Sequence, residues 1–75
     1  MEIKFSRHAK RRAKLYGISE TIITNIIKTM NLHKGEHEII TDVPGFKYPL
    51  KIVVSFEENL TTVVTNYPLK KGGKK

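Results

Sequence analysis

The sequence has 75 residues, with no cysteine, no tryptophan and no long apolar run. Without cysteine, the chain can form neither a disulfide framework nor a thiolate metal site. This composition fits a reducing compartment, so we expect a cytoplasmic location. No apolar stretch approaches the roughly 20 residues that a transmembrane helix needs, and the first residues have no hydrophobic signal-peptide core. We therefore expect no membrane partner.

Common local signatures of enzyme chemistry are also missing. The sequence has no glycine-rich phosphate loop before a helix, no nucleophile elbow and no carboxylate pair with a clear role. His33 and His37 lie four residues apart, but no cysteine and no acidic pattern supports them as ligands. We expect no metal site and no cofactor.

Positive charge is present in excess and is concentrated at the two ends of the chain. The formal net charge is +7. Residues 1–14 carry six lysines and arginines against one glutamate, and residues 70–75 carry four lysines, whereas acidic residues outnumber basic ones between them. A localised basic surface attracts phosphates. We expect an acidic partner, first of all RNA or DNA; an acidic protein, or a role in solubility alone, is the alternative.

Residues 1–69 are expected to form one α+β domain in the order β-α-α-β-β-β. Ser6 and Ser19 suit the N-caps of two helices, at residues 7–16 and 20–30, and Gly17 suits the end of the first. Strands are expected at residues 2–5, 36–42, 50–56 and 61–67. Pro44 and Gly45 predict a type II turn, and Asn59 tolerates a left-handed turn. Short connections predict a short antiparallel sheet with both helices packed on one face. The tail, residues 70–75, offers nothing apolar to bury and is expected to be disordered.

Apolar residues predict where the core lies. At about 100° per residue, the isoleucines of the second helix, together with Ile18 and Met30, cover about half of its circumference. In the strand at residues 50–56, Leu50, Ile52, Val54 and Phe56 alternate with more polar neighbours. We expect these two apolar faces to pack together.

The first helix places two polar residues where apolar residues are expected. Its cations Arg7, Lys10, Arg11 and Lys14 share one side. His8 and Arg12, one turn apart, fall instead within the arc of Ala9, Ala13 and the aromatic residues. In one interpretation, Arg12 bonds nearby carbonyls and His8 is a partly buried core histidine. In the other, the pair faces a phosphate-binding cleft between this helix and the sheet.

Other candidate contacts to nucleic acid lie along the second half of the chain. Tyr48 and Tyr67 suit base stacking, or are simply rim residues. Lys47 and Lys51 suit the phosphate backbone, or belong to a solvated strand face.

Two short segments resemble a known group of proteins. The stretch Phe5-Ser6-Arg7-His8-Ala9-Lys10-Arg11-Arg12-Ala13-Lys14-Leu15-Tyr16-Gly17-Ile18-Ser19 resembles the opening of a family of small, mostly uncharacterised prokaryotic domains with an N-terminal His-x-x-x-Arg helix. The ending Thr62-Val63-Val64-Thr65-Asn66-Tyr67-Pro68 is similar to the last strand of that family. The order of elements also resembles the RelE/ParE superfamily of toxins from toxin–antitoxin pairs.

The resemblance implies an endoribonuclease that cleaves mRNA, often on the ribosome, or in some branches a toxin directed at gyrase. It also implies an acidic antitoxin partner. Lys47, Lys51 and Tyr67 are the candidates for the basic and tyrosine residues that act on the sheet in this superfamily. No arginine follows Arg12, so His8 and Arg12 would have to carry more of the chemistry.

Two main hypotheses follow. The first is metal-independent transesterification of RNA, in which His8 transfers a proton and Arg12 stabilises the phosphate charge, while Lys10, Arg11 and the tail hold the backbone. The second is a non-catalytic module in which Lys10, Arg11, Lys14 and the tail bind nucleic acid or an acidic protein.

Overall fold

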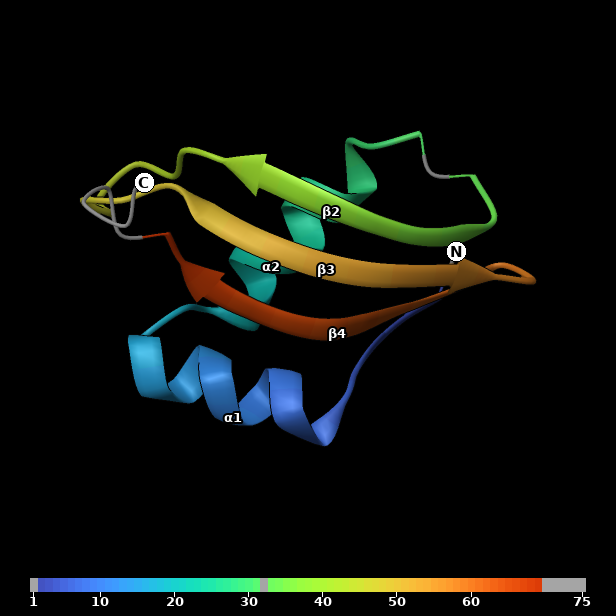
Figure 1. Ribbon diagram of the computed structural model, residues 1–75, viewed down its shortest axis with the longest axis horizontal. Coiled ribbons are helices and arrows are strands. Elements are labelled where there is room, and N and C mark those ends of the chain that lie inside the picture. Colours follow the sequence, from blue (N-terminus) through green and yellow to red (C-terminus); the bar gives the residue numbers. More distant parts are fainter. Residues whose placement is uncertain (1, 32, 70–75) are drawn as a thin grey trace.

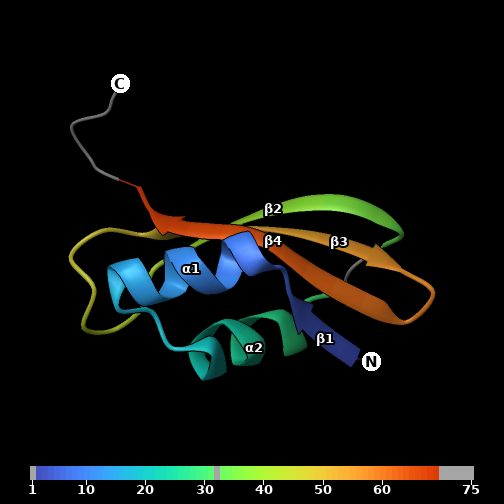
Figure 2. The same cartoon turned by 90° about the horizontal axis from the view of Figure 1, so that it is seen from below.

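The computed structural model describes residues 2–31 and 33–69 and confirms the α+β class. A four-stranded sheet has the strand order β1-β4-β3-β2. In Figure 1, α2 lies behind the sheet and α1 lies alongside β4 rather than across it; Figure 2 shows the same arrangement from below. Neither helix in the described ranges is long and apolar enough to cross a membrane. The elements are β1 (Glu2–Phe5), α1 (Arg7–Tyr16), α2 (Glu20–Lys28), β2 (Gly35–Thr41), β3 (Leu50–Glu57) and β4 (Leu60–Pro68).

The sheet is mixed, so the prediction of a purely antiparallel sheet was wrong. β2, β3 and β4 form the expected antiparallel meander. β1 pairs with β4 in parallel, in a register that runs from Glu2 opposite Leu60 to Phe5 opposite Val63. Short turns force neighbouring strands to run antiparallel, but both helices and two strands separate β1 from β4. That long connection permits parallel pairing.

The helix caps are those expected from the sequence, but α2 ends earlier. The hydroxyls of Ser6 and Ser19 accept N–H groups of the first turns of α1 and α2, and Gly17 ends α1 with a φ of 68°. The second helix was expected to reach residue 30. Instead, Thr29 closes it by donating its hydroxyl to the carbonyl oxygen of Ile26, 2.7 Å away.

The two turns between the last strands have the predicted chemistry. The N–H of Phe46 donates to the carbonyl oxygen of Val43 at 3.0 Å, and Gly45 has a φ of 91°, as a type II turn requires. Between β3 and β4, Glu58 and Asn59 both have positive φ, which is typical of a two-residue type I′ hairpin turn. Asn59 was expected there, whereas Glu58 was not. β1 has the predicted bounds, and the ends of the other strands differ from the predicted ones by at most one residue.

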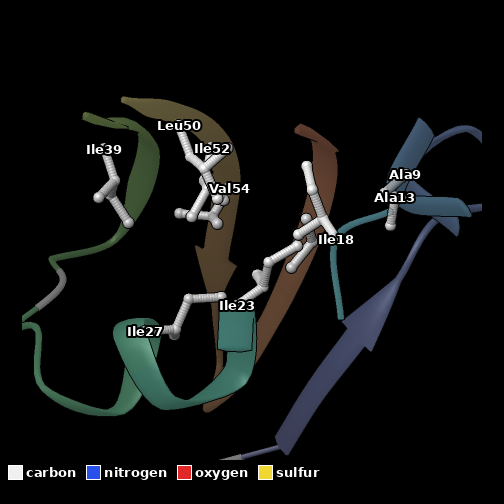
Figure 3. Packing of buried hydrophobic residues seen from close by; sticks show 10 residues of the cluster. Ala9, Ala13, Ile18, Ile23, Ile27, Ile39, Leu50, Ile52 and Val54 are labelled. Atoms are coloured by element: carbon white, nitrogen blue, oxygen red, sulfur yellow. The ribbon is translucent and has the colours of Figure 1, made fainter. Parts of the chain in front are cut away.

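Aliphatic side chains from α2 and the sheet form the core. Figure 3 shows Ile23 and Ile27 of α2 in one cluster with Leu50, Ile52 and Val54, three of the four residues predicted for this face of β3. The fourth, Phe56, is half-buried and lies outside the cluster. Met30 lies beyond the helix and is exposed, so the buried face of α2 is narrower than expected. The buried apolar residues are Ala9, Ala13, Ile18, Ile23, Ile27, Ile39, Leu50, Ile52, Val54 and Val63.

Candidate nucleic-acid interface

Helix α1 is held against β4 by a small set of polar contacts. The backbone N–H of Ser6 donates to the carbonyl oxygen of Val63 at 3.0 Å, and its hydroxyl donates to that of Val64 at 2.9 Å. Further along, Nδ2 of the fully buried Asn66 donates to the carbonyl oxygen of Ala9 at 3.1 Å. These bonds hold the first turn of α1 against the last strand.

A bulge in β4 turns Asn66 toward the helix. Val53 lies opposite Thr65 while Val54 lies opposite Val63, so Val64 is an extra residue in the ladder. An extra residue shifts the alternation of faces along the rest of the strand. Asn66 therefore lies on the buried side, where its Oδ1 has no hydrogen-bond partner among the described residues.

The outer surface of α1 is cationic and is not neutralised by any described carboxylate. Only Ala9 and Ala13 are buried on this helix, because two small side chains suffice to pack it against β4. The single ion pair in residues 2–31 and 33–69 joins Lys51 and Glu38, far along the chain from α1. The exposed cations of the helix are Arg7, Lys10, Arg11 and Lys14.

His8 and Arg12 do not lie in a cleft. His8 is exposed, so the expectation that it faces the packed side of the helix was wrong. The buried arc of α1 is narrow, and it extends only across the two alanines. Arg12 is half-buried, and its Nη1 donates to the hydroxyl oxygen of Tyr16, 3.4 Å away. No pocket is found within the described ranges, so no cleft encloses the pair.

Lys51 and Tyr67 lie together on the sheet face opposite α2. They are directly opposite each other in the β3–β4 ladder. The Nζ of Lys51 lies 3.2 Å from Oε1 of Glu38 on β2. The hydrogen bond and charge of Glu38 raise the pKa of Lys51 above its ordinary value of 10.5, with a smaller contribution from Tyr67. Lys51 is thus a cation that already has an acidic partner, unlike those of α1.

Lys47 and Tyr48 form a separate pair in the loop before β3. The Nζ of Lys47 lies 5.6 Å from the centre of the Tyr48 ring, within the range of a cation–π contact. Lys47 is exposed and Tyr48 is half-buried. The structure therefore distributes the predicted contacts over three places, namely α1, the β3–β4 ladder and this loop. The predicted tail contacts fall on residues 70–75, outside the described ranges.

Charge is distributed asymmetrically across the sheet. The edge strand β2, at the far side of the sheet from α1 (Figure 1), carries exposed Glu36 and Glu38, and exposed Asp42 follows it. A polyanion is attracted to α1 and repelled from β2.

Two residues that the sequence did not single out shape this surface. Asn66 was read only as part of the final strand, because a bulge cannot be located from alternation alone. Tyr16 was assigned to the apolar arc, but it is 39% exposed and bonded to Arg12. Its spacing of four residues from Arg12 was the available signal.

No group of three or more potential metal-ligating side chains occurs among the residues that the structure describes. His37 instead bonds the carbonyl oxygen of His33 through Nε2.

Comparisons of the chain with protein-family models, with curated proteins and with solved structures find no match.

Proposed function

We propose that this domain binds RNA through the outward surface of α1. One observation carries the proposal: the exposed cations of this helix have no carboxylate partner in the described part of the chain. Unpaired cations exchange their counterions for phosphates at little cost, because no internal ion pair has to be broken. Lys10, Arg11 and Lys14 are the central contacts.

Nucleic acid accounts for this surface better than an acidic protein does. The exposed cations are distributed along α1, which suits a flexible chain of phosphates. RNA is proposed over duplex DNA because half-buried tyrosines, Tyr48 and Tyr67, lie beside lysines at the two other candidate places. Unpaired RNA bases stack on such side chains.

A pair of triple variants tests this proposal. Lys10→Gln, Arg11→Gln and Lys14→Gln together remove three charges from α1 and retain good helix formers. The matched control removes three exposed charges elsewhere, by Lys4→Gln, Lys28→Gln and Lys34→Gln. In fluorescence anisotropy with a labelled single-stranded RNA, the α1 variant should bind on the order of tenfold more weakly or worse. The control should stay close to the parent, and equal losses in both variants would refute a specific role of α1.

Endoribonuclease activity of the toxin type is the second candidate function. It is favoured by the position of His8 one turn from Arg12 on the helix that carries the proposed phosphate contacts. In this reaction the ribose 2′-OH attacks the neighbouring phosphorus, and the 5′-oxygen of the next nucleotide leaves. His8 would accept the hydroxyl proton, and Arg12 would stabilise the additional negative charge on the phosphate. The chemistry requires no metal ion.

Induced expression in a bacterial host tests this second function. The parent protein is compared with His8→Ala and Arg12→Ala for growth and for mRNA integrity, and the purified proteins are incubated with RNA in the presence of EDTA. Growth arrest with fragmented mRNA, relieved by either substitution, supports the reaction. Intact RNA in the presence of the parent protein would exclude it and leave RNA binding alone.

An acidic antitoxin is the partner that a toxin of this kind would require. Such a partner would cover the cations of α1, and RNA binding would then be blocked. Competition between a co-expressed acidic protein and labelled RNA for the purified domain would measure this exclusion.

A further inference from the structure

Tyr16 is the most exposed of the three tyrosines. Its residue surface is 39% exposed, whereas Tyr48 and Tyr67 are both half-buried. Tyr16 lies in the last turn of α1, a helix in which only Ala9 and Ala13 are buried. An aromatic ring is thus presented on the cationic helix and is not part of the core.

The surroundings of Tyr16 combine apolar surface with positive charge. Arg12, one turn earlier, donates to the Tyr16 hydroxyl oxygen at 3.4 Å. That bond is made at the rim of the ring and orients the ring relative to the guanidinium. The neighbouring residue Leu15 is 68% exposed. An exposed ring next to a guanidinium has the chemistry of a site where a base stacks while its phosphate is neutralised.

From this arrangement we infer that Tyr16 is a stacking site for an unpaired RNA base, with Arg12 holding the adjacent phosphate. The inference rests on the proposed binding of RNA by α1 and adds a preference to it. The bases of a duplex are already stacked on one another, and their faces are not available to a protein ring. The domain should therefore prefer single-stranded over double-stranded RNA, and the preference should depend on the ring of Tyr16.

The test compares Tyr16→Leu, Tyr16→Phe and the control Ile40→Ala, which truncates an exposed apolar side chain on β2. Each is titrated with a labelled single-stranded RNA and with the same strand annealed to its complement. Tyr16→Leu should weaken single-strand binding by roughly five- to 100-fold, the range for loss of one base–aromatic stack. Tyr16→Phe retains the ring and should remain within about threefold of the parent protein, because it loses one hydrogen bond made at the surface. Ile40→Ala should leave the affinity near that of the parent protein.

Two further readouts separate stacking from other losses. The salt dependence of binding should be the same for Tyr16→Leu and the parent, because no phosphate contact is removed. Duplex binding should also be unchanged. Equal single-strand affinities for Tyr16→Leu and parent, or equal losses on single strand and duplex, would overturn the inference while leaving RNA binding by α1 intact. A parent protein that binds neither RNA would overturn the proposed function itself, and the inference with it.

Discussion

At the scale of single residues, an existing acidic partner distinguishes one cation from the others. Lys51 was predicted to contact RNA, but its Nζ is held by Glu38 at 3.2 Å. A phosphate would have to displace that carboxylate before it gained a full interaction. The described cations of α1 have no such competitor. A lysine of α1 can therefore bind a phosphate without first losing an ion pair, whereas Lys51 cannot.

The pairing of Lys51 predicts a measurable titration. Glu38, and to a lesser extent Tyr67, raise the pKa of Lys51 above 10.5. In Glu38→Gln the pKa should fall back toward that value, as followed by NMR of the lysine side chain. Since the folded-state pKa is raised, the stabilising contribution is complete below about pH 10 and is lost as the pH rises further. An unchanged Lys51 pKa in Glu38→Gln would show that the pair does not persist in solution.

Asn66 allows a second prediction at this scale. Asn66→Asp places a carboxyl group at a fully buried position, where desolvation favours the neutral acid. Its folded-state pKa is then raised above the unfolded value of about 3.9. The variant should be most stable below that pH and should lose about 3 kcal/mol or more by pH 7. Urea unfolding from pH 4 to pH 8 measures this loss.

The control for this experiment is Asn66→Leu. It removes the bond to Ala9 together with the unpartnered Oδ1, so its stability should change little and should not depend on pH. A pH-independent Asn66→Asp protein would contradict the buried position of this side chain.

At the scale of elements, the two helices are attached to the sheet in different ways. Helix α2 contributes the fully buried Ile23 and Ile27, whereas α1 contributes two alanines. Hydrogen bonds to β4 compensate for the small apolar contact of α1, and Ser6 supplies two of them. The helix that carries the proposed site is thus positioned mainly by polar contacts.

Ser6 and Ser19 provide a matched pair for testing this difference. Ser6→Ala removes a cap for Ala9 and the hydroxyl bond to Val64, whereas Ser19→Ala removes only a cap for Thr21. Loss of a cap costs about 0.5–2 kcal/mol, and Ser6→Ala should lie at the upper end because a second bond is lost. Equal changes in the free energy of unfolding would show that Ser6 does not fasten α1 to β4.

Local sequence signals predicted the elements well and their arrangement less well. Caps at Ser6, Ser19 and Gly17 mark short-range hydrogen bonds, so they can be read from neighbouring residues. The parallel pairing of β1 with β4 depends on a connection of more than 50 residues, and no local pattern encodes it. The bulge at Val64 is likewise not encoded by a local pattern, so the burial of Asn66 could not be predicted.

The candidate site shows the same limits. The cationic side of α1 follows directly from helical periodicity. The exposure of His8 and Tyr16 does not follow from it. Periodicity gives the direction of each side chain around the helix, but not how much of the helix circumference the sheet buries. That buried fraction depends on the position of β4, which the sequence could not predict.

At the scale of the whole molecule, positive and negative charge lie toward opposite edges of the sheet. The basic α1 flanks β4, and the acidic β2 forms the opposite edge. The path of a bound RNA should follow α1 and avoid β2. Helix α1 has ten residues and is therefore about 15 Å long, enough for only a few phosphates of a single strand.

The most direct test of the central claim is the salt dependence of single-strand RNA binding. The parent protein and the α1 variant with Lys10, Arg11 and Lys14 replaced by Gln are titrated from about 50 to 200 mM salt. The affinity of the parent should fall steeply, and the slope of log K against log salt should be shallower by about 2 in the variant, at roughly 0.7 per lost phosphate contact. The Lys4, Lys28 and Lys34 variant should keep the parent slope. A parent protein whose affinity does not depend on salt, or an α1 variant with the parent slope, would contradict RNA binding by this helix.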